Sequence, residues 1–140
     1  MPNPIDITPK LSRLALLLVS FSLLPLSVSA APDEPTIPAS AQIQNWYANC
    51  HGGRYLLQLL PCQLPVTATN LRGVVLSDSN CQPDANGLSH CHNQVALSNG
   101  RRITVVNTHF MRINRCLAAG EQLSLRSLGA NWAVGQLDRP

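Results

Sequence analysis

Short apolar runs alternate with clusters of turn-forming residues at regular spacing from Val66 to the end of the chain. This spacing is typical of a small β-sandwich or β-barrel. The pattern predicts five strands, at residues 70–77, 88–97, 102–110, 122–127 and 132–137. Segments rich in turn residues separate the first strand from the second and the third from the fourth.

The segment before the predicted strands has a helical pattern. Apolar side chains recur every three or four residues from Ile43 to Cys50. Ser40 can cap the first turn, and the glycine pair that follows His51 can end the last. We therefore expect one short helix over residues 40–50. The next apolar run, RYLLQLL at residues 54–60, fits a buried strand and a further helical turn equally well.

Residues 90–111 are predicted to form one β-hairpin, because the pair Asn99-Gly100 stands between two segments of strand-like sequence. A two-residue type I′ turn needs positive φ at both central positions, and Asn and Gly adopt that conformation at least cost. With these two residues as the loop, His90 is expected opposite His109.

The predicted register would bring three of the four histidines, His90, His92 and His109, to one face of the hairpin. Three imidazoles so placed can converge on one ion, and neutral imidazole suits copper and zinc. A thioether from Met111 or a thiolate from Cys116 would be a further ligand that shifts the preference toward copper(I). The alternative interpretation is that the histidines lie at the rim of a barrel and only form hydrogen bonds.

Residues 1–30 have the features of a secretory signal peptide. Lys10 and Arg13 precede an apolar run at residues 14–28, and small residues follow it up to Ala30. Pro25 interrupts the run before it could form a good membrane-spanning helix. We expect cleavage after Ala30, a poorly ordered proline-rich leader at residues 31–39 and a single domain at residues 40–140. The alternative is an uncleaved N-terminal anchor.

Export would place the domain in the periplasm or outside the cell, where disulfides form and persist. The chain has five cysteines, so at least one thiol is left over. Pairing of nearest neighbours predicts a Cys50–Cys62 bridge and a Cys81–Cys91 bridge, and it leaves Cys116. Each short loop closed in this way would contribute on the order of 2.5 to 3 kcal/mol.

The order of the predicted strands resembles a five-stranded antiparallel barrel of the oligonucleotide/oligosaccharide-binding (OB) or SH3-like type. The resemblance covers roughly residues 71–138 and rests on the strand count, on the turn at residues 117–121 and on Gly73, where a barrel strand can bend. It implies an all-β fold, to which the helix predicted at residues 40–50 is added at the N-terminal side. It implies no function, because such barrels host many unrelated ones.

In size and compartment the domain also resembles small exported barrels that bind copper through His and Met. It departs from their usual pattern because Met111 is the only methionine after the predicted signal peptide. Those proteins have a closely spaced pair of methionines.

Composition disfavours enzymes and nucleic-acid binding proteins. Without the signal peptide the net charge is small and positive, and Phe110 and Trp132 are the only aromatic residues in the predicted strands. The carboxylates lie in turns and tails rather than in pairs, and the sequence has no G-x-S-x-G motif and no glycine-rich phosphate loop. We therefore expect a non-enzymatic protein that does not bind nucleic acid.

Two hypotheses for the function follow from the sequence. In the first, the protein is a small exported binding protein that holds copper or zinc through the histidine cluster. In the second, it is a disulfide-stabilised accessory domain without a small ligand, which docks on another exported protein.

Overall fold

The structure, a computed structural model, describes residues 34–60 and 69–139. The predicted signal peptide, the first part of the leader and Cys62 lie outside these ranges. Within the described ranges, no helix combines the length and the apolar character needed to cross a membrane.

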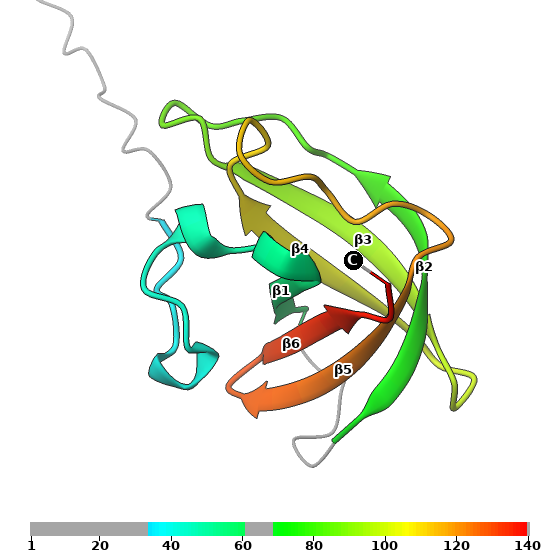
Figure 1. Cartoon of the computed structure of the whole chain (residues 1–140). Helices are drawn as coiled ribbons and strands as arrows, with labels where there is room; N and C mark the ends of the chain where they lie inside the picture. The colour runs from blue at the N-terminus through cyan, green and yellow to red at the C-terminus, as the bar shows by residue number, and fades with distance from the viewer. Residues whose placement is uncertain (1–33, 61–68, 140) are drawn as a thin grey trace, which may run out of the picture. The chain divides into compact units, whose positions relative to one another are not determined.

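The described residues form six strands in one closed antiparallel barrel (Figure 1). The strands are β1 (Arg54–Leu59), β2 (Leu71–Ser79), β3 (Ser89–Leu97), β4 (Arg102–His109), β5 (Gln122–Gly129) and β6 (Trp132–Leu137). Their order around the barrel is β1-β4-β3-β2-β5-β6, and pairing of β1 with β6 closes it.

The prediction of a mainly β barrel is confirmed, but the count of five strands is wrong. The additional strand is β1, which comes from the apolar run that the sequence left open between strand and helix. Tyr55, Leu57 and Leu59 point into the barrel, whereas Leu56 lies on the outer face. This alternation with period two is that of a strand whose two faces are both covered.

The single helix expected at residues 40–50 does not form. Three 3-10 turns take its place, η1 (Ala39–Ala41), η2 (Trp46–Ala48) and η3 (His51–Gly53). Gln42 and Cys50 have φ of 59° and 73°, in the left-handed region, and this conformation interrupts a helix at both positions. The Asn45 side chain accepts a hydrogen bond from the backbone of Ala48 and thus starts a separate turn there.

Two apolar clusters hold the fold together. The first fills the barrel with side chains from all six strands and from the β4–β5 connection, where Leu117 is fully buried. The second lies between the outer face of β1 and β6 and the N-terminal turns, where the rings of Trp46 and Trp132 are 6.1 Å apart. The N-terminal segment therefore covers one side of the barrel (Figure 1).

Gly73 allows β2 to pass close to β3 inside the barrel. A Cβ atom at this position would lie 2.6 Å from Cγ1 of Val95, which is closer than real Cβ contacts. The absence of a side chain, rather than a positive φ, is what the barrel requires here.

The β3–β4 hairpin has a three-residue loop, so the predicted two-residue turn is wrong. The backbone N–H of Gly100 donates to the carbonyl of Leu97 at 2.9 Å, and the N–H of Leu97 donates to the carbonyl of Arg101 at 2.8 Å. Gly100 has φ of 84°, whereas Asn99 is not among the residues with positive φ. A type I turn followed by one left-handed residue is the usual form of this loop.

The extra loop residue shifts the register by one position. His90 pairs with Thr108, and His109 pairs with Ser89. A shift of one residue moves every side chain of one strand to the other face. The predicted pairing of His90 with His109 is therefore wrong.

Asn49 connects the N-terminal turns to the barrel. Its Nδ2 donates to the carbonyls of Leu56 at 3.1 Å and Thr108 at 2.8 Å. Its Oδ1 accepts from the backbone N–H groups of Leu56 at 2.7 Å and Cys50 at 3.0 Å. The side chain is fully buried, and the Cys50 N–H also donates to the carbonyl of Arg54 at 3.0 Å, so it is the groups of Leu56 and Thr108 for which Asn49 matters most.

We expect Asn49→Ala to lower the free energy of unfolding by about 3 kcal/mol or more, because it leaves several buried backbone groups without partners. Asn45→Ala is the matched control, since it removes only an exposed cap and should cost about 1 kcal/mol or less. Equilibrium denaturation of both variants measures the difference. Equal losses would show that Asn49 has no special role.

Candidate functional site

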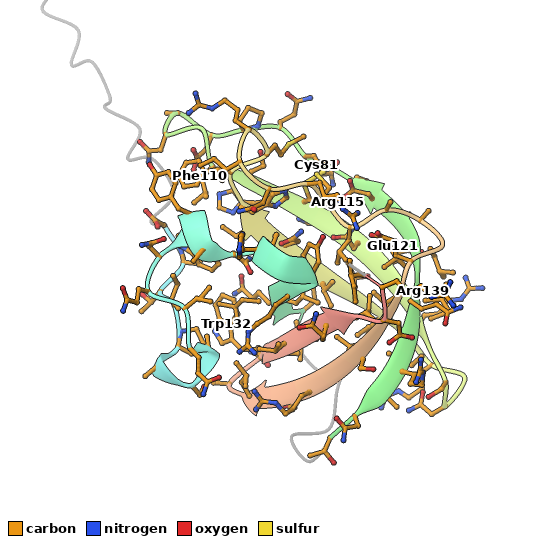
Figure 2. The ribbon with its side chains drawn as sticks, in the orientation of Figure 1. Cys81, Phe110, Arg115, Glu121, Trp132 and Arg139 are labelled. Atoms are coloured by element: carbon orange, nitrogen blue, oxygen red, sulfur yellow. A yellow bond between two sulfur atoms is a disulfide. The ribbon has the colours of Figure 1, made fainter. Side chains whose placement is uncertain are left out.

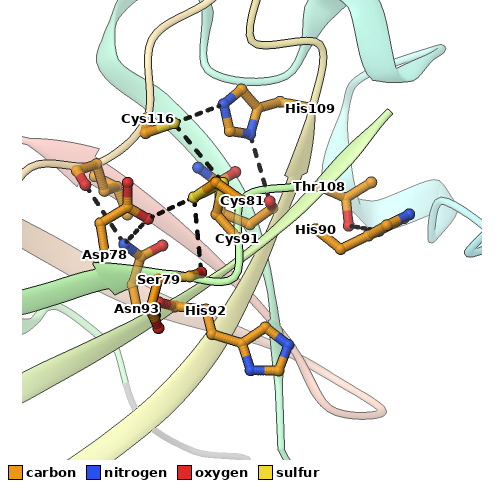
Figure 3. Close-up of a disulfide and its surroundings, with 12 residues drawn as sticks. Asp78, Ser79, Cys81, His90, Cys91, His92, Asn93, Thr108, His109 and Cys116 are labelled. Carbon is orange, nitrogen blue, oxygen red and sulfur yellow. Dashed lines mark hydrogen bonds between the residues drawn. A yellow bond between two sulfur atoms is a disulfide. The ribbon is translucent and has the colours of Figure 1, made fainter. Parts of the chain in front are cut away.

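The three candidate histidines do not share a face in the structure. His90 is on the outer face, with Nδ1 at 3.0 Å from Thr108 Oγ1 and Nε2 at 3.4 Å from Asp84 Oδ2. His92 is on the same outer face, whereas His109 is fully buried on the inner face. Figure 3 shows the three rings pointing in different directions. The predicted three-histidine arrangement is therefore not formed, and the shifted hairpin register is the reason.

The two further candidate ligands also separate. Met111 lies in the turn after β4 with 46% of its surface exposed. Cys116, from the same β4–β5 connection, lies beside His109, and its Sγ is 3.4 Å from His109 Nε2. Of the candidate ligands, only His109 and Cys116 are in contact with each other.

Cys116 also contacts a disulfide. The predicted Cys81–Cys91 bridge is confirmed, and it joins the β2–β3 connection to the first part of β3. The Sγ of Cys116 lies 3.7 Å from the Sγ of Cys91, which is fully buried (Figure 3). Three sulfur atoms from two connections and one strand therefore meet at one place.

Asp78, near the end of β2, completes this group, which we call the sulfur cluster: Asp78, Cys81, Cys91 and Cys116. One ligand atom from each residue lies within 4.8 Å of the others. Asp78 Oδ1 lies 3.2 Å from Cys81 Sγ and accepts a hydrogen bond from Asn93 Nδ2 at 2.9 Å. In the described part of the chain, this is the only group of three or more His, Cys, Asp or Glu that could hold an ion.

The hydrogen bonds of His109 define its tautomer. Nδ1 lies 3.4 Å from the backbone carbonyl oxygen of Asn107, which can only accept a hydrogen bond. Nδ1 therefore carries the hydrogen, and Nε2 presents a lone pair to the Cys116 thiol. Burial lowers the pKa of His109, which favours this neutral form.

The pKa of the Cys116 thiol is raised. Burial is the largest cause, and the negative charge of Asp78 adds to it, because both disfavour the thiolate. Cys116 is consequently a protonated thiol that contacts a base, a carboxylate and a disulfide.

Two contacts hold Cys116 in place. Leu117 inserts into the barrel core directly after it. Arg115, directly before it, forms an ion pair with Glu121 at 2.5 Å, and Glu121 also accepts a hydrogen bond from the backbone of Ala118 at 2.7 Å. Figure 2 shows Arg115 and Glu121 side by side in the β4–β5 connection.

Cys50 is a separate free thiol. It is buried and donates to Asn107 Oδ1 at 3.3 Å, and burial raises its pKa. The expected Cys50–Cys62 bridge involves a residue outside the described ranges, and the structure has Cys50 unbridged.

Asp78 is a member of the sulfur cluster that the sequence pattern does not predict. Asp78 comes from β2, whose pairing with β3 includes a bulge between Val75 and Ser77. A bulge of this kind changes which side chains point to a given face, and the sequence pattern of β2 contains no sign of it.

Comparison with known protein families, with curated proteins and with solved structures found no match to this chain.

We expect Asp78→Asn to accelerate alkylation of Cys116 in the folded chain at pH 8 by roughly two- to tenfold. Removal of the carboxylate charge lowers the pKa of the thiol, and the thiolate is the reacting form. Mass spectrometry of the peptide that begins at Cys116 measures the rate, with a chelator present. Asp84→Asn is the control, because Asp84 contacts His90 instead. An unchanged rate in Asp78→Asn would contradict the assignment.

Proposed function

We propose that this protein is an exported binding protein whose reduced form holds one soft transition-metal ion, zinc or copper(I), in the sulfur cluster. Cys81, Cys91 and Cys116 supply thiolates, and Asp78 supplies a carboxylate oxygen. The observation that carries the proposal is the convergence of these four ligand atoms within 4.8 Å. The donor set fits the proposed ions, because thiolates select copper(I) and zinc.

The spacing of the ligand atoms supports a shared ion. With zinc–sulfur bonds of about 2.3 Å, two thiolates on one tetrahedral ion lie about 3.8 Å apart. The Sγ atoms of Cys91 and Cys116 lie 3.7 Å apart. The carboxylate oxygen of Asp78, which zinc accepts more readily than copper(I) does, lies 3.2 Å from the Sγ of Cys81.

Charge provides a second argument. A carboxylate and three thiols within one partly buried group disfavour each other's ionised forms, and Asp78 already raises the pKa of Cys116. A bound cation reverses this effect, because a coordinated thiol loses its proton to the solvent. Metal binding would thus resolve the unfavourable charge pattern of the reduced cluster.

The disulfide and the metal ion would compete for the same sulfur atoms. Cys81 and Cys91 form a disulfide in the structure. A two-electron reductant, such as a dithiol or a phosphine, has to reduce this disulfide before both cysteines can act as ligands. Occupancy would therefore follow the redox state of the surroundings. A signal peptide, as the sequence predicts, would deliver the protein to an oxidising compartment, where the bridged, metal-free form would predominate.

The alternative, an accessory domain that docks on another exported protein, has its own support. Tyr47, Met111 and Ile113 are large apolar side chains with 58%, 46% and 54% of their surface exposed. Asn114 Nδ2 donates to the backbone carbonyl of Tyr47 at 3.0 Å, so the two segments that carry these side chains are connected. Exposed apolar side chains that lie together are common at protein interfaces.

We expect the reduced, chelator-treated chain to bind one zinc or copper(I) ion, and the oxidised chain to bind neither. Titration against a chromophoric chelator, under argon, gives the stoichiometry and the affinity. Cobalt(II) should give the intense charge-transfer absorbance of thiolate ligation. Cys91→Ser and Cys116→Ser should each weaken binding by at least about tenfold, since each removes one ligand.

Cys50→Ser is the matched control, because it replaces a buried thiol outside the sulfur cluster and serine retains a donor for Asn107. It should bind metal as the unsubstituted chain does. Circular dichroism checks that each variant is folded. If Cys91→Ser and Cys116→Ser both bind metal with unchanged affinity, the sulfur site is wrong.

A further inference from the structure

The geometry points to a further activity of the oxidised chain: Cys116 attacks Cys91 and moves the disulfide from Cys81–Cys91 to Cys91–Cys116. This thiol–disulfide exchange goes beyond metal binding and needs no metal. It rests on two contacts of one thiol, namely those with the disulfide and with His109.

The attacking group is already in contact with its target. The Sγ atoms of Cys116 and Cys91 are 3.7 Å apart, which is a van der Waals contact between sulfur atoms. Cys50, the other free thiol among the described residues, instead donates to Asn107. Exchange proceeds by attack of a thiolate on a disulfide sulfur, in line with the bond that breaks. The Sγ atoms of Cys116 and Cys81 lie within 4.8 Å of each other, so a side-chain rotation of Cys116 has to bring the three sulfur atoms into line before the attack.

His109 is the base that the attack requires. Its Nδ1–H is directed to the Asn107 carbonyl, so the lone pair of Nε2 faces the Cys116 thiol at 3.4 Å. The arrangement has the three parts of a nucleophile–base pair: a thiol, an imidazole within reach and a third group that orients the imidazole. Its position on the inner face keeps His109 away from competing solvent.

The step balances without an oxidant or a reductant. The Cys116 proton moves to His109 Nε2 as the Cys116–Cys91 bond forms. The Cys91–Cys81 bond breaks, and its electron pair leaves with Cys81 as a thiolate. The imidazolium then returns the proton to Cys81, directly or through water, so one thiol and one disulfide are present before and after.

The leaving sulfur is the accessible one. Cys81 is partly exposed in the β2–β3 connection, whereas Cys91 is fully buried in β3. Exchange would therefore keep the buried Cys91 bridged and move the free thiol from the β4–β5 connection to the β2–β3 connection. It would also tie the β4–β5 connection to β3 and release the β2–β3 connection from it.

The peptides of a tryptic digest distinguish the two disulfides. Cys81 and Cys91 lie in one peptide, residues 73–101, and Cys116 lies in another, residues 116–126. The Cys81–Cys91 bridge is internal to the first peptide, whereas the exchanged bridge cross-links the two. Cleavage before Asp84 then separates Cys81 from Cys91 and identifies the sulfur that is bonded to Cys116.

The experiment uses the oxidised full-length chain with chelator. Free thiols are blocked with N-ethylmaleimide after acid quench, and the digest is analysed by mass spectrometry. We expect a fraction of the chain to carry the Cys91–Cys116 cross-link, with the maleimide on Cys81. If the maleimide is found on Cys116 alone, or if the cross-link joins Cys116 to Cys81, the proposal is wrong.

A second measurement tests the role of His109. N-ethylmaleimide is added to the folded chain at increasing concentrations. Once alkylation becomes faster than exchange, the share of the label on Cys81 should fall, and the concentration at which it falls is the crossover. His109→Gln should shift this crossover to lower reagent concentrations, by at least about tenfold, because a positioned base accelerates proton transfer. The ratio of the two disulfides measured after acid quench should change little, since a base alters the rate of exchange and not its equilibrium.

His92→Gln is the matched control, because this histidine lies on the outer face of the same strand pair and should leave the crossover unchanged. A crossover that stays in place in a folded His109→Gln chain overturns the base assignment. The assay contains no metal, so loss of exchange with intact zinc binding rejects this inference alone. Intact exchange without zinc binding rejects only the proposed function.

Discussion

The register of the β3–β4 hairpin decides which side chains enter the barrel, and the conformation of Gly100 sets that register. Its φ of 84° closes a three-residue loop, so Cys91 pairs with Asn107 and both side chains lie inside. A loop shorter by one residue would put one of the two strands in the opposite orientation. The burial of His109 beside Cys116 therefore depends on one residue in a distant turn.

The irregular segments are held as firmly as the strands. Asn49 makes three hydrogen bonds that connect the N-terminal turns to β1 and β4. Leu117 fixes the β4–β5 connection by burial in the barrel core. Cys81 holds the β2–β3 connection through its bridge to β3. Leu117 directly follows Cys116, and Cys81 is itself part of the sulfur cluster, so the positions of the sulfur atoms depend on the folding of the barrel.

Strand positions and the Cys81–Cys91 bridge were predictable because both depend on residues close together in the chain. β1 was ambiguous, because a six-residue apolar run has no distinctive period. The prediction of a helix at residues 40–50 was wrong because Gln42 and Cys50 adopt left-handed conformations, which the apolar spacing does not reveal. The prediction of the three-histidine site was wrong for a similar reason. Asp78, Cys91 and Cys116 meet through strand pairing and a long connection, and a shift of one residue in the hairpin is enough to exchange one set of neighbours for another.

The Sγ atom of Cys91 takes part in both proposed activities. It is a partner in the observed disulfide, the target of Cys116 in exchange and a ligand in the reduced cluster. A sulfur in a disulfide has no thiolate to offer a metal, so these states exclude one another. Because Cys91 is fully buried and Cys81 is partly exposed, an external thiol reaches the bridge at Cys81. Its attack releases the Cys91 thiolate beside Cys116 and leaves Cys81 in a mixed disulfide, so a second thiol has to free Cys81 before all three thiolates are available to a metal ion.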